Sequence, residues 1–102
     1  MGRHDRLCIG IYNIWDSGWR DEYRQKTVDL VAKHGGRFLV RPDCRVRKLE
    51  GEPVIKTGMV VIEFPDSGAA QAWYDDPDYQ PLKQLRQTGS QLDFVLVDGL
   101  GE

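Results

Sequence analysis

Cysteine is scarce in this sequence, where Cys8 and Cys44 are the only thiols among 102 residues. Two cysteines are too few for the disulfide framework that holds many small secreted domains together. They form no Cys-x-x-Cys pair, and no spacing of cysteine and histidine suits a zinc site. We therefore expect reduced thiols, no metal site and a cytoplasmic protein.

Long apolar runs and an excess of positive charge are also missing. No stretch is long and apolar enough to predict a secretory signal or a membrane-spanning helix. The formal net charge is −2, with acidic and basic residues interleaved, which disfavours a nucleic-acid partner. The one basic run, Arg45–Lys48, is explained more simply as a charged strand edge. We expect a single domain over residues 1–102, with neither nucleic acid nor a membrane as a partner.

The sequence has none of the short motifs that mark common catalytic sites. It has no nucleophile motif, phosphate-binding loop, dinucleotide fingerprint or cluster of metal ligands. An enzyme built on this chain would therefore need no cofactor. It would depend on acid–base chemistry and on the positioning of its substrate.

What the sequence does contain is a series of short apolar runs and helical stripes. The apolar runs are rich in β-branched and aromatic residues and end at turn residues, which predicts strands. They cover Leu7–Ile14, Arg37–Arg41 (resumed at Val46–Leu49), Gly58–Phe64 and Phe94–Val97.

Two helical regions separate these strands. Apolar residues at three- and four-residue steps predict a helix from Trp19 to His34, with Asp16 or Ser17 as its N-cap. Asp66 or Ser67 should cap a second helix. That helix should break at Asp76-Pro77 and restart with Asp76 as a new N-cap, because proline is tolerated in the first helical turn.

The order strand, helix, strand, strand, helix, strand is the ferredoxin-like βαββαβ unit of α+β proteins. Its four strands form one antiparallel sheet with both helical regions on one face. Residues of each strand alternate between the two faces. The expected helix face holds Ile9, Ile11, Phe38, Val40, Val60, Ile62, Phe64, Val95 and Val97. The expected opposite face holds Cys8, Gly10, Tyr12, Arg37, Leu39, Arg41, Met59, Val61, Glu63, Phe94, Leu96 and Asp98.

The expected opposite face is too apolar to be exposed to water and too polar to form an ordinary buried core. A second copy of the chain, related by a two-fold axis, is the most economical cover for it. A mixed face of this kind also suits a lined small-molecule cavity between the two copies.

Three strings of the sequence resemble a known family: His34–Arg41, Val60–Pro65 and Ala72–Gln80. They are similar to the family called domain of unknown function 1330. That family is similar to the wider dimeric α/β-barrel superfamily, which includes antibiotic-biosynthesis monooxygenases and muconolactone-isomerase-like proteins. The resemblance covers nearly the whole chain. It implies a ferredoxin-like homodimer that forms an α/β barrel, and it leaves the chemistry open.

Glu63 is the first candidate for a functional residue. A carboxylate on the expected opposite face would have a shifted pKa and could act as a general acid or base. Arg41 could bind a carboxylate or phosphate there with its planar guanidinium, and Tyr12 could donate a hydrogen bond. The alternative is a structural ion pair between Glu63 and Arg41 or Arg37.

The other candidates lie on the helical regions. His34 could shuttle protons, although a histidine in the last helical turn also interacts favourably with the helix dipole. Trp73, Tyr79 and Arg86 could contact a ligand, or could instead pack in the core or face solvent. Two functions therefore remain open. One is a cofactor-free acid–base enzyme, such as an isomerase, lyase or cyclase, acting on a small organic acid or aromatic metabolite. The other is a non-catalytic binding or dimerisation module.

Overall fold

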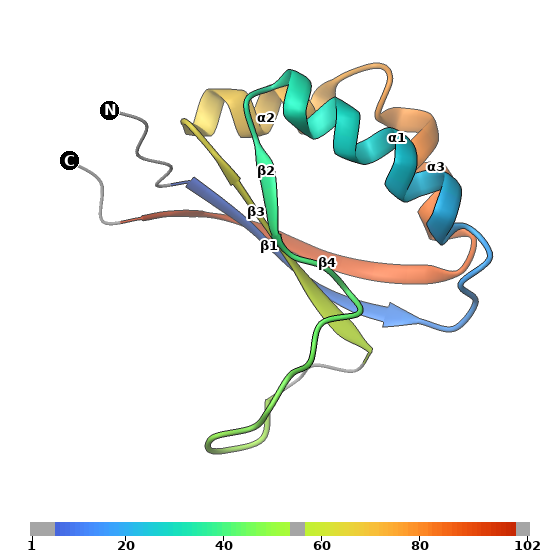
Figure 1. Ribbon diagram of the computed structural model, residues 1–102, viewed down its shortest axis with the longest axis vertical. Helices are drawn as coiled ribbons and strands as arrows, with labels where there is room; N and C mark the ends of the chain where they lie inside the picture. The colour runs from blue at the N-terminus through green and yellow to red at the C-terminus, as the bar shows by residue number, and fades with distance from the viewer. Residues whose placement is uncertain (1–5, 54–56, 100–102) are drawn as a thin grey trace.

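The computed structural model describes residues 6–53 and 57–99, and its elements follow the expected βαββαβ order (Figure 1). The second helical region consists of two helices. The element bounds are β1 Arg6–Ile14, α1 Arg20–Lys33, β2 Arg37–Val40, β3 Gly58–Phe64, α2 Ser67–Asp75, α3 Gln80–Gln87 and β4 Ser90–Asp98. The prediction of an α+β, ferredoxin-like fold is confirmed. The expected continuation of β2 at Val46–Leu49 is wrong, because residues 41–53 form a loop without a strand.

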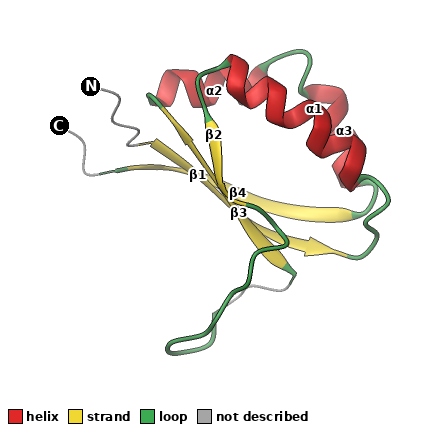
Figure 2. Ribbon diagram, in the orientation of Figure 1, coloured by secondary structure: helices red, strands yellow, loops and turns green. Residues whose placement is uncertain are grey.

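The four strands form one antiparallel sheet in the order β2-β3-β1-β4. All three helices lie on the same side of this sheet, and the loop between β2 and β3 extends away from them (Figure 2). The core therefore fills the layer between the helices and one sheet face. We call the other face, which none of the described helices or strands covers, the open face. No described helix has the length and apolar character needed to cross a membrane.

The expected faces are correct for β3 and wrong for β1 and β4. Cys8 and Tyr12, not Ile9 and Ile11, belong to the buried core under the helices. Phe94 pairs with Gly10 and shares their side of the sheet, so Val95 and Val97 lie on the open face. Both faces of these strands are apolar, so alternation separates two sets of residues without deciding which set faces the helices.

Gly10 explains why the sequence pattern predicts the wrong core face for β1. A Cβ atom there would lie 2.6 Å from Leu92 Cδ1 and 2.9 Å from Val60 Cγ1. The small residue is thus needed where neighbouring side chains close over β1. Its lack of a side chain makes the core face of β1 look less apolar than the open face.

Helix α1 buries the stripe that the sequence predicts. Tyr23, Thr27, Leu30 and Val31 are its buried residues. The expected cap is wrong, because Asp16 accepts a hydrogen bond from the Gly18 backbone N–H at 2.9 Å and leaves α1 without a side-chain cap.

The expected cap of α2 is confirmed. Asp66 is the N-cap residue, and its carboxylate accepts a hydrogen bond from the Ala69 backbone N–H at 2.7 Å. The N-terminal end of α2 therefore has one of its free backbone donors satisfied.

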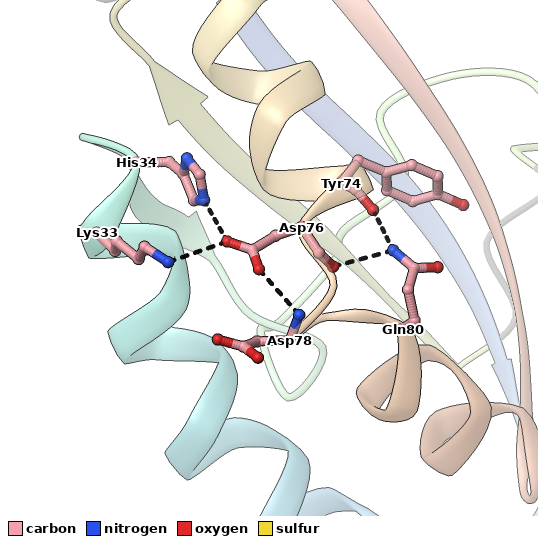
Figure 3. A network of polar contacts seen from close by, with 6 residues as sticks. All are labelled: Lys33, His34, Tyr74, Asp76, Asp78 and Gln80. Atoms are coloured by element: carbon pink, nitrogen blue, oxygen red, sulfur yellow. Dashed lines mark hydrogen bonds and ion pairs between the residues drawn. The ribbon is translucent and has the colours of Figure 1, made fainter.

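The helical region breaks at Asp76 as expected, although α3 itself begins later, at Gln80. The Asp76 carboxylate accepts a hydrogen bond from the Asp78 backbone N–H at 2.9 Å, so it caps the turn before α3 (Figure 3). The same carboxylate lies 2.7 Å from His34 Nε2 and 3.3 Å from Lys33 Nζ at the end of α1. These contacts tie the α2–α3 break to α1.

Candidate ligand-binding cavity

A cavity of about 380 Å³ lies between α1 and the helix face of the sheet. Its volume is in the range of about 300–1,000 Å³ that is usual for small-molecule sites. Five aromatic side chains from five parts of the fold contribute to its wall. They are Tyr12 of β1, Trp19 before α1, Tyr23 of α1, Phe38 of β2 and Phe94 of β4.

The cavity has a polar rim with more positive than negative charges. Arg20 and Arg24 of α1 and Arg41 after β2 contribute cations, and Asp21 and Asp43 contribute carboxylates. One elementary positive charge is therefore in excess among these five side chains. Such a rim favours the entry of an anion.

Arg41 reaches the cavity because β2 is irregular. Phe38 pairs with Ile62, but Val40 pairs with Val61, so the register shifts between them. A shift of this kind re-aims the residues that follow it. The Arg41 guanidinium consequently lies over the Phe38 ring, 5.7 Å from its centroid, and lines the cavity on the helix side of the sheet.

Two residues of the cavity wall carry buried polar atoms that have no hydrogen-bond partner among the described residues. They are Trp19 Nε1 and Thr27 Oγ1. Buried polar atoms are rarely left unpaired, because each one costs on the order of 1–3 kcal/mol. Both groups can donate a hydrogen bond, so the wall can bind a ligand that carries an acceptor.

Three buried tyrosines meet beside the cavity. The hydroxyls of Tyr23 and Tyr79 are 2.6 Å apart, and Tyr12 lies close enough to Tyr23 for the two to influence each other's pKa. Burial raises the pKa of Tyr12 to about 12 and also raises the pKa of Tyr23 and Tyr79, although the charge of Arg86 works against each rise. At neutral pH these hydroxyls are therefore hydrogen-bond donors and not bases.

Arg86 lies inside the protein next to these tyrosines. Its side chain belongs to α3, and the residue is 4% exposed. Burial by itself would lower the pKa of Arg86, but the surrounding tyrosines outweigh it and the pKa is raised. Within residues 6–53 and 57–99 no carboxylate forms an ion pair with Arg86, and its Nε has no hydrogen-bond partner. It is thus a buried cation beside hydroxyl groups.

The chain matches the model of the family described as Domain of unknown function (DUF1330) over residues 6–100. It belongs to that family. No curated protein matches this DUF1330 chain. The expected resemblance is confirmed at the level of the family.

Solved structures with the same fold include two proteins of low sequence identity. A protein of unknown function from Rhodopseudomonas palustris superposes with a TM-score of 0.73 at 12% identity, covering 98% of this chain and 86% of that one. SnoaB, a cofactor-independent oxygenase from Streptomyces nogalater, superposes with a TM-score of 0.62 at 14% identity, covering 98% of this chain and 97% of SnoaB. At these identities the likeness shows the fold alone.

The structure brings four of the candidate site residues of this DUF1330 chain together. Tyr12 and Arg41 line the cavity. Tyr79 and Arg86 belong to the buried tyrosine cluster next to it. Trp73 is fully buried beneath them and packs on Tyr79, with ring centroids 4.5 Å apart.

Glu63 and His34 lie outside this group. Glu63 is paired with Arg37, which was the structural alternative considered for it, and it is not among the residues that line the cavity. His34 contacts Asp76 at the far end of α1. Glu63, Arg41 and Tyr12 therefore do not share one cavity. The change of face in β1 and the shifted register of β2 separate Tyr12 and Arg41 from Glu63.

Sequence reasoning missed Trp19, Tyr23 and Thr27 as cavity residues. They stand on the buried stripe of the α1 region, where apolar spacing predicts core packing. The available signal was the polar atom that each of them carries on that stripe. A buried tryptophan, tyrosine or threonine needs a partner for its donor group.

Proposed function

We propose that this protein binds a small aromatic compound in the cavity between α1 and the sheet. The observation that carries the proposal is the pairing of an aromatic wall with unpaired hydrogen-bond donors at Trp19 and Thr27. Small-molecule sites usually combine an apolar wall with a few polar groups that fix the orientation of the ligand. The aromatic rings supply stacking surfaces, and the donors select a ligand with an acceptor.

Binding and orientation are the roles that this geometry supports best. The two groups expected to perform acid–base chemistry are paired elsewhere, Glu63 with Arg37 and His34 with Asp76. Tyr12 and Tyr23 keep their protons at neutral pH. Any reaction in the cavity would therefore depend on positioning and on the stabilisation of negative charge rather than on proton abstraction by these groups.

Calorimetric titration with two bicyclic probes tests the proposal. We expect 2-naphthoate, 2-naphthamide or both to bind, and Val28→Phe to weaken that binding strongly, because Val28 lines the cavity and a phenyl group would occupy part of the space that the probe needs. Val46→Phe is the matched control, since Val46 lies on the exposed loop outside the cavity. The proposal fails if neither probe binds the parent protein, or if Val28→Phe and Val46→Phe bind the probes equally well.

We also propose that the protein works as a homodimer in which the open faces of two sheets pack together. The open face carries Ile9 and Ile11 of β1, Val61 of β3, and Val95 and Val97 of β4. Val95 of the edge strand β4 is 58% exposed and pairs with Ile9 of β1. An apolar patch of this extent favours a protein partner, and a two-fold axis lets one patch cover another. This arrangement would leave the cavity on the helix side of each subunit.

A further inference from the structure

We propose that the ligand of this cavity is an aromatic oxyanion, and that Tyr12, Tyr23 and Trp19 hold its charged oxygen with Arg86 as the positioning cation behind them. This inference rests on the proposed function and narrows it to one class of ligand. It covers carboxylates and phenolates, which present the same oxygen chemistry to hydrogen-bond donors.

The first argument is the excess of hydrogen-bond donors around Tyr12 and Tyr23. The Arg86 guanidinium lies close enough to Tyr23 and Tyr79 to interact with both electrostatically, and a guanidinium can only donate hydrogen bonds. Each hydroxyl that accepts one bond still has its own proton to donate. The Tyr23–Tyr79 hydrogen bond uses one of the three hydroxyl protons, and a bond between Tyr12 and Tyr23 would use one more. At least one hydroxyl proton is therefore left for an acceptor outside the cluster.

The second argument is the position of this excess. Tyr12 and Tyr23 line the cavity, whereas Arg86 does not and reaches it through their hydroxyls. Trp19 and Thr27 add two further groups with unpaired donor capacity on the same wall. A guanidinium that donates to a hydroxyl oxygen polarises that hydroxyl and makes it a stronger donor to the next group. Four residues that carry donor groups thus line one cavity.

The third argument is charge. A buried cation is costly unless an anion compensates it, and the described part of the chain offers Arg86 hydroxyl groups in place of a carboxylate. The rim residues Arg20, Arg24 and Arg41 add positive potential at the entrance. A neutral acceptor would satisfy the donors, but only an anion would satisfy both the donors and the charge.

Arg86 could also serve only to hold the tyrosines in place. The test must separate that structural role from the proposed recognition of an anion. Preference for an anion over a neutral probe of the same shape provides the separation. We expect the parent protein to bind 2-naphthoate at least about tenfold more tightly than 2-naphthamide, the usual advantage of a hydrogen bond to a charged group. Arg86→Met should reduce this ratio to about one while 2-naphthamide still binds.

Tyr12→Phe keeps the aromatic ring, removes one donor, and covers the case in which Arg86→Met does not fold. We expect it to lower the ratio severalfold, because losing a hydrogen bond to a carboxylate costs more than losing one to a neutral amide. 4-Nitrophenol tests whether the site binds phenolates. Its ionised form absorbs visible light, so binding of that form should increase the absorbance at a fixed pH. A preference for 2-naphthoate over 2-naphthamide without a response to 4-nitrophenol assigns the site to carboxylates. A response to 4-nitrophenol, with the two naphthalene probes bound equally well, assigns it to phenolates.

The possible failures can be told apart. If 2-naphthamide binds as tightly as both anions, the ligand class is wrong while the cavity remains a binding site. If the ratio is high in the parent and unchanged in the folded Arg86→Met and Tyr12→Phe variants, these residues do not recognise the anion and the inference is overturned. If no probe binds, both the inference and the proposed function fail.

Discussion

At the scale of single residues, Arg86 and the hydroxyls around it are the least ordinary feature of the protein. The sequence singled out Arg86, Tyr79 and Tyr12 as candidates, but it could not show that they meet. An arginine on an amphipathic helix usually faces water, and only the packing of α3 against α1 and β4 places this one inside. Residue type and spacing were therefore enough to name these side chains and not enough to predict their burial.

The tyrosine cluster predicts how stability depends on alkaline pH. Burial raises the pKa of Tyr12 from its ordinary value of 10.0 to about 12, so the folded state favours the neutral hydroxyl. Its contribution to stability is complete below about pH 10 and is lost as the pH rises towards 12. We expect the free energy of unfolding to fall across this window, and to fall less in Tyr12→Phe, in urea titrations at pH 8, 10 and 11. Equal losses in both proteins would contradict this assignment.

At the scale of the elements, the alternation of apolar and polar residues predicted the strands correctly but could not assign all of their faces. It predicted the existence of four strands and the order of all elements. It placed the faces of β1 and β4 wrongly because both faces are apolar and Gly10 hides the core side. It also could not foresee the shifted register in β2 that sends Arg41 to the cavity, since such a shift depends on pairing with β3.

The break between α2 and α3 was predictable because Asp76-Pro77 is a local signal. Its contacts with α1 were not predictable, since Lys33 and His34 approach Asp76 only after the helices pack (Figure 3). Local capping chemistry can be inferred from neighbours in the sequence. Contacts between helices also require their packing to be known.

The Asp76 contacts predict a loss of stability in acid. The hydrogen bond from His34, followed by that from the Asp78 backbone N–H, lowers the pKa of Asp76 from 3.8 to about 2. The charged form is therefore favoured on folding, and its contribution is present above about pH 4 and lost as the pH falls through 2. We expect Asp76→Asn to have a lower Tm than the parent at pH 7, and this difference to shrink between pH 4 and 2.

Asp75→Asn is the matched control, because Asp75 is an exposed neighbour of the same type. It should leave the Tm at pH 7 nearly unchanged. A difference between Asp76→Asn and the parent that stays constant from pH 7 to pH 2 would show that the charge of Asp76 does not stabilise the fold.

At the scale of the whole molecule, the fold was the most predictable property. The order of elements and the family resemblance both pointed to a ferredoxin-like sheet, and the family match confirms the resemblance. The location of the cavity was not predictable. It lies under α1, on the opposite side of the sheet from the expected one, because it depends on which face of β1 carries Tyr12. Because the face of β1 was predicted with a shift of one residue, the expected site lay on the wrong side of the sheet.

The open face predicts the effect of a charge on assembly. Val95→Lys would place one cation from each subunit in the apolar interface of the proposed dimer, where each would lose its hydration. We expect the parent to have twice the chain mass in size-exclusion chromatography with light scattering at micromolar concentration, and Val95→Lys to shift towards the monomer. Val46→Lys, on the exposed loop, should remain a dimer. A monomeric parent at that concentration would rule out the dimer.

The central claim is that the cavity beneath α1 is a ligand site with donors on its wall, and the indole N–H signal of Trp19 reports on it most directly. In ¹⁵N-labelled protein, saturation with 2-naphthoate should move the Trp19 Nε1–H signal, assigned by its loss in Trp19→Phe, because that donor is buried and unpaired at the cavity wall. The signal of Trp15, which is 62% exposed and outside the cavity, should stay in place. An unmoved Trp19 signal at saturating 2-naphthoate, or shifts confined to residues away from the cavity, would contradict the account.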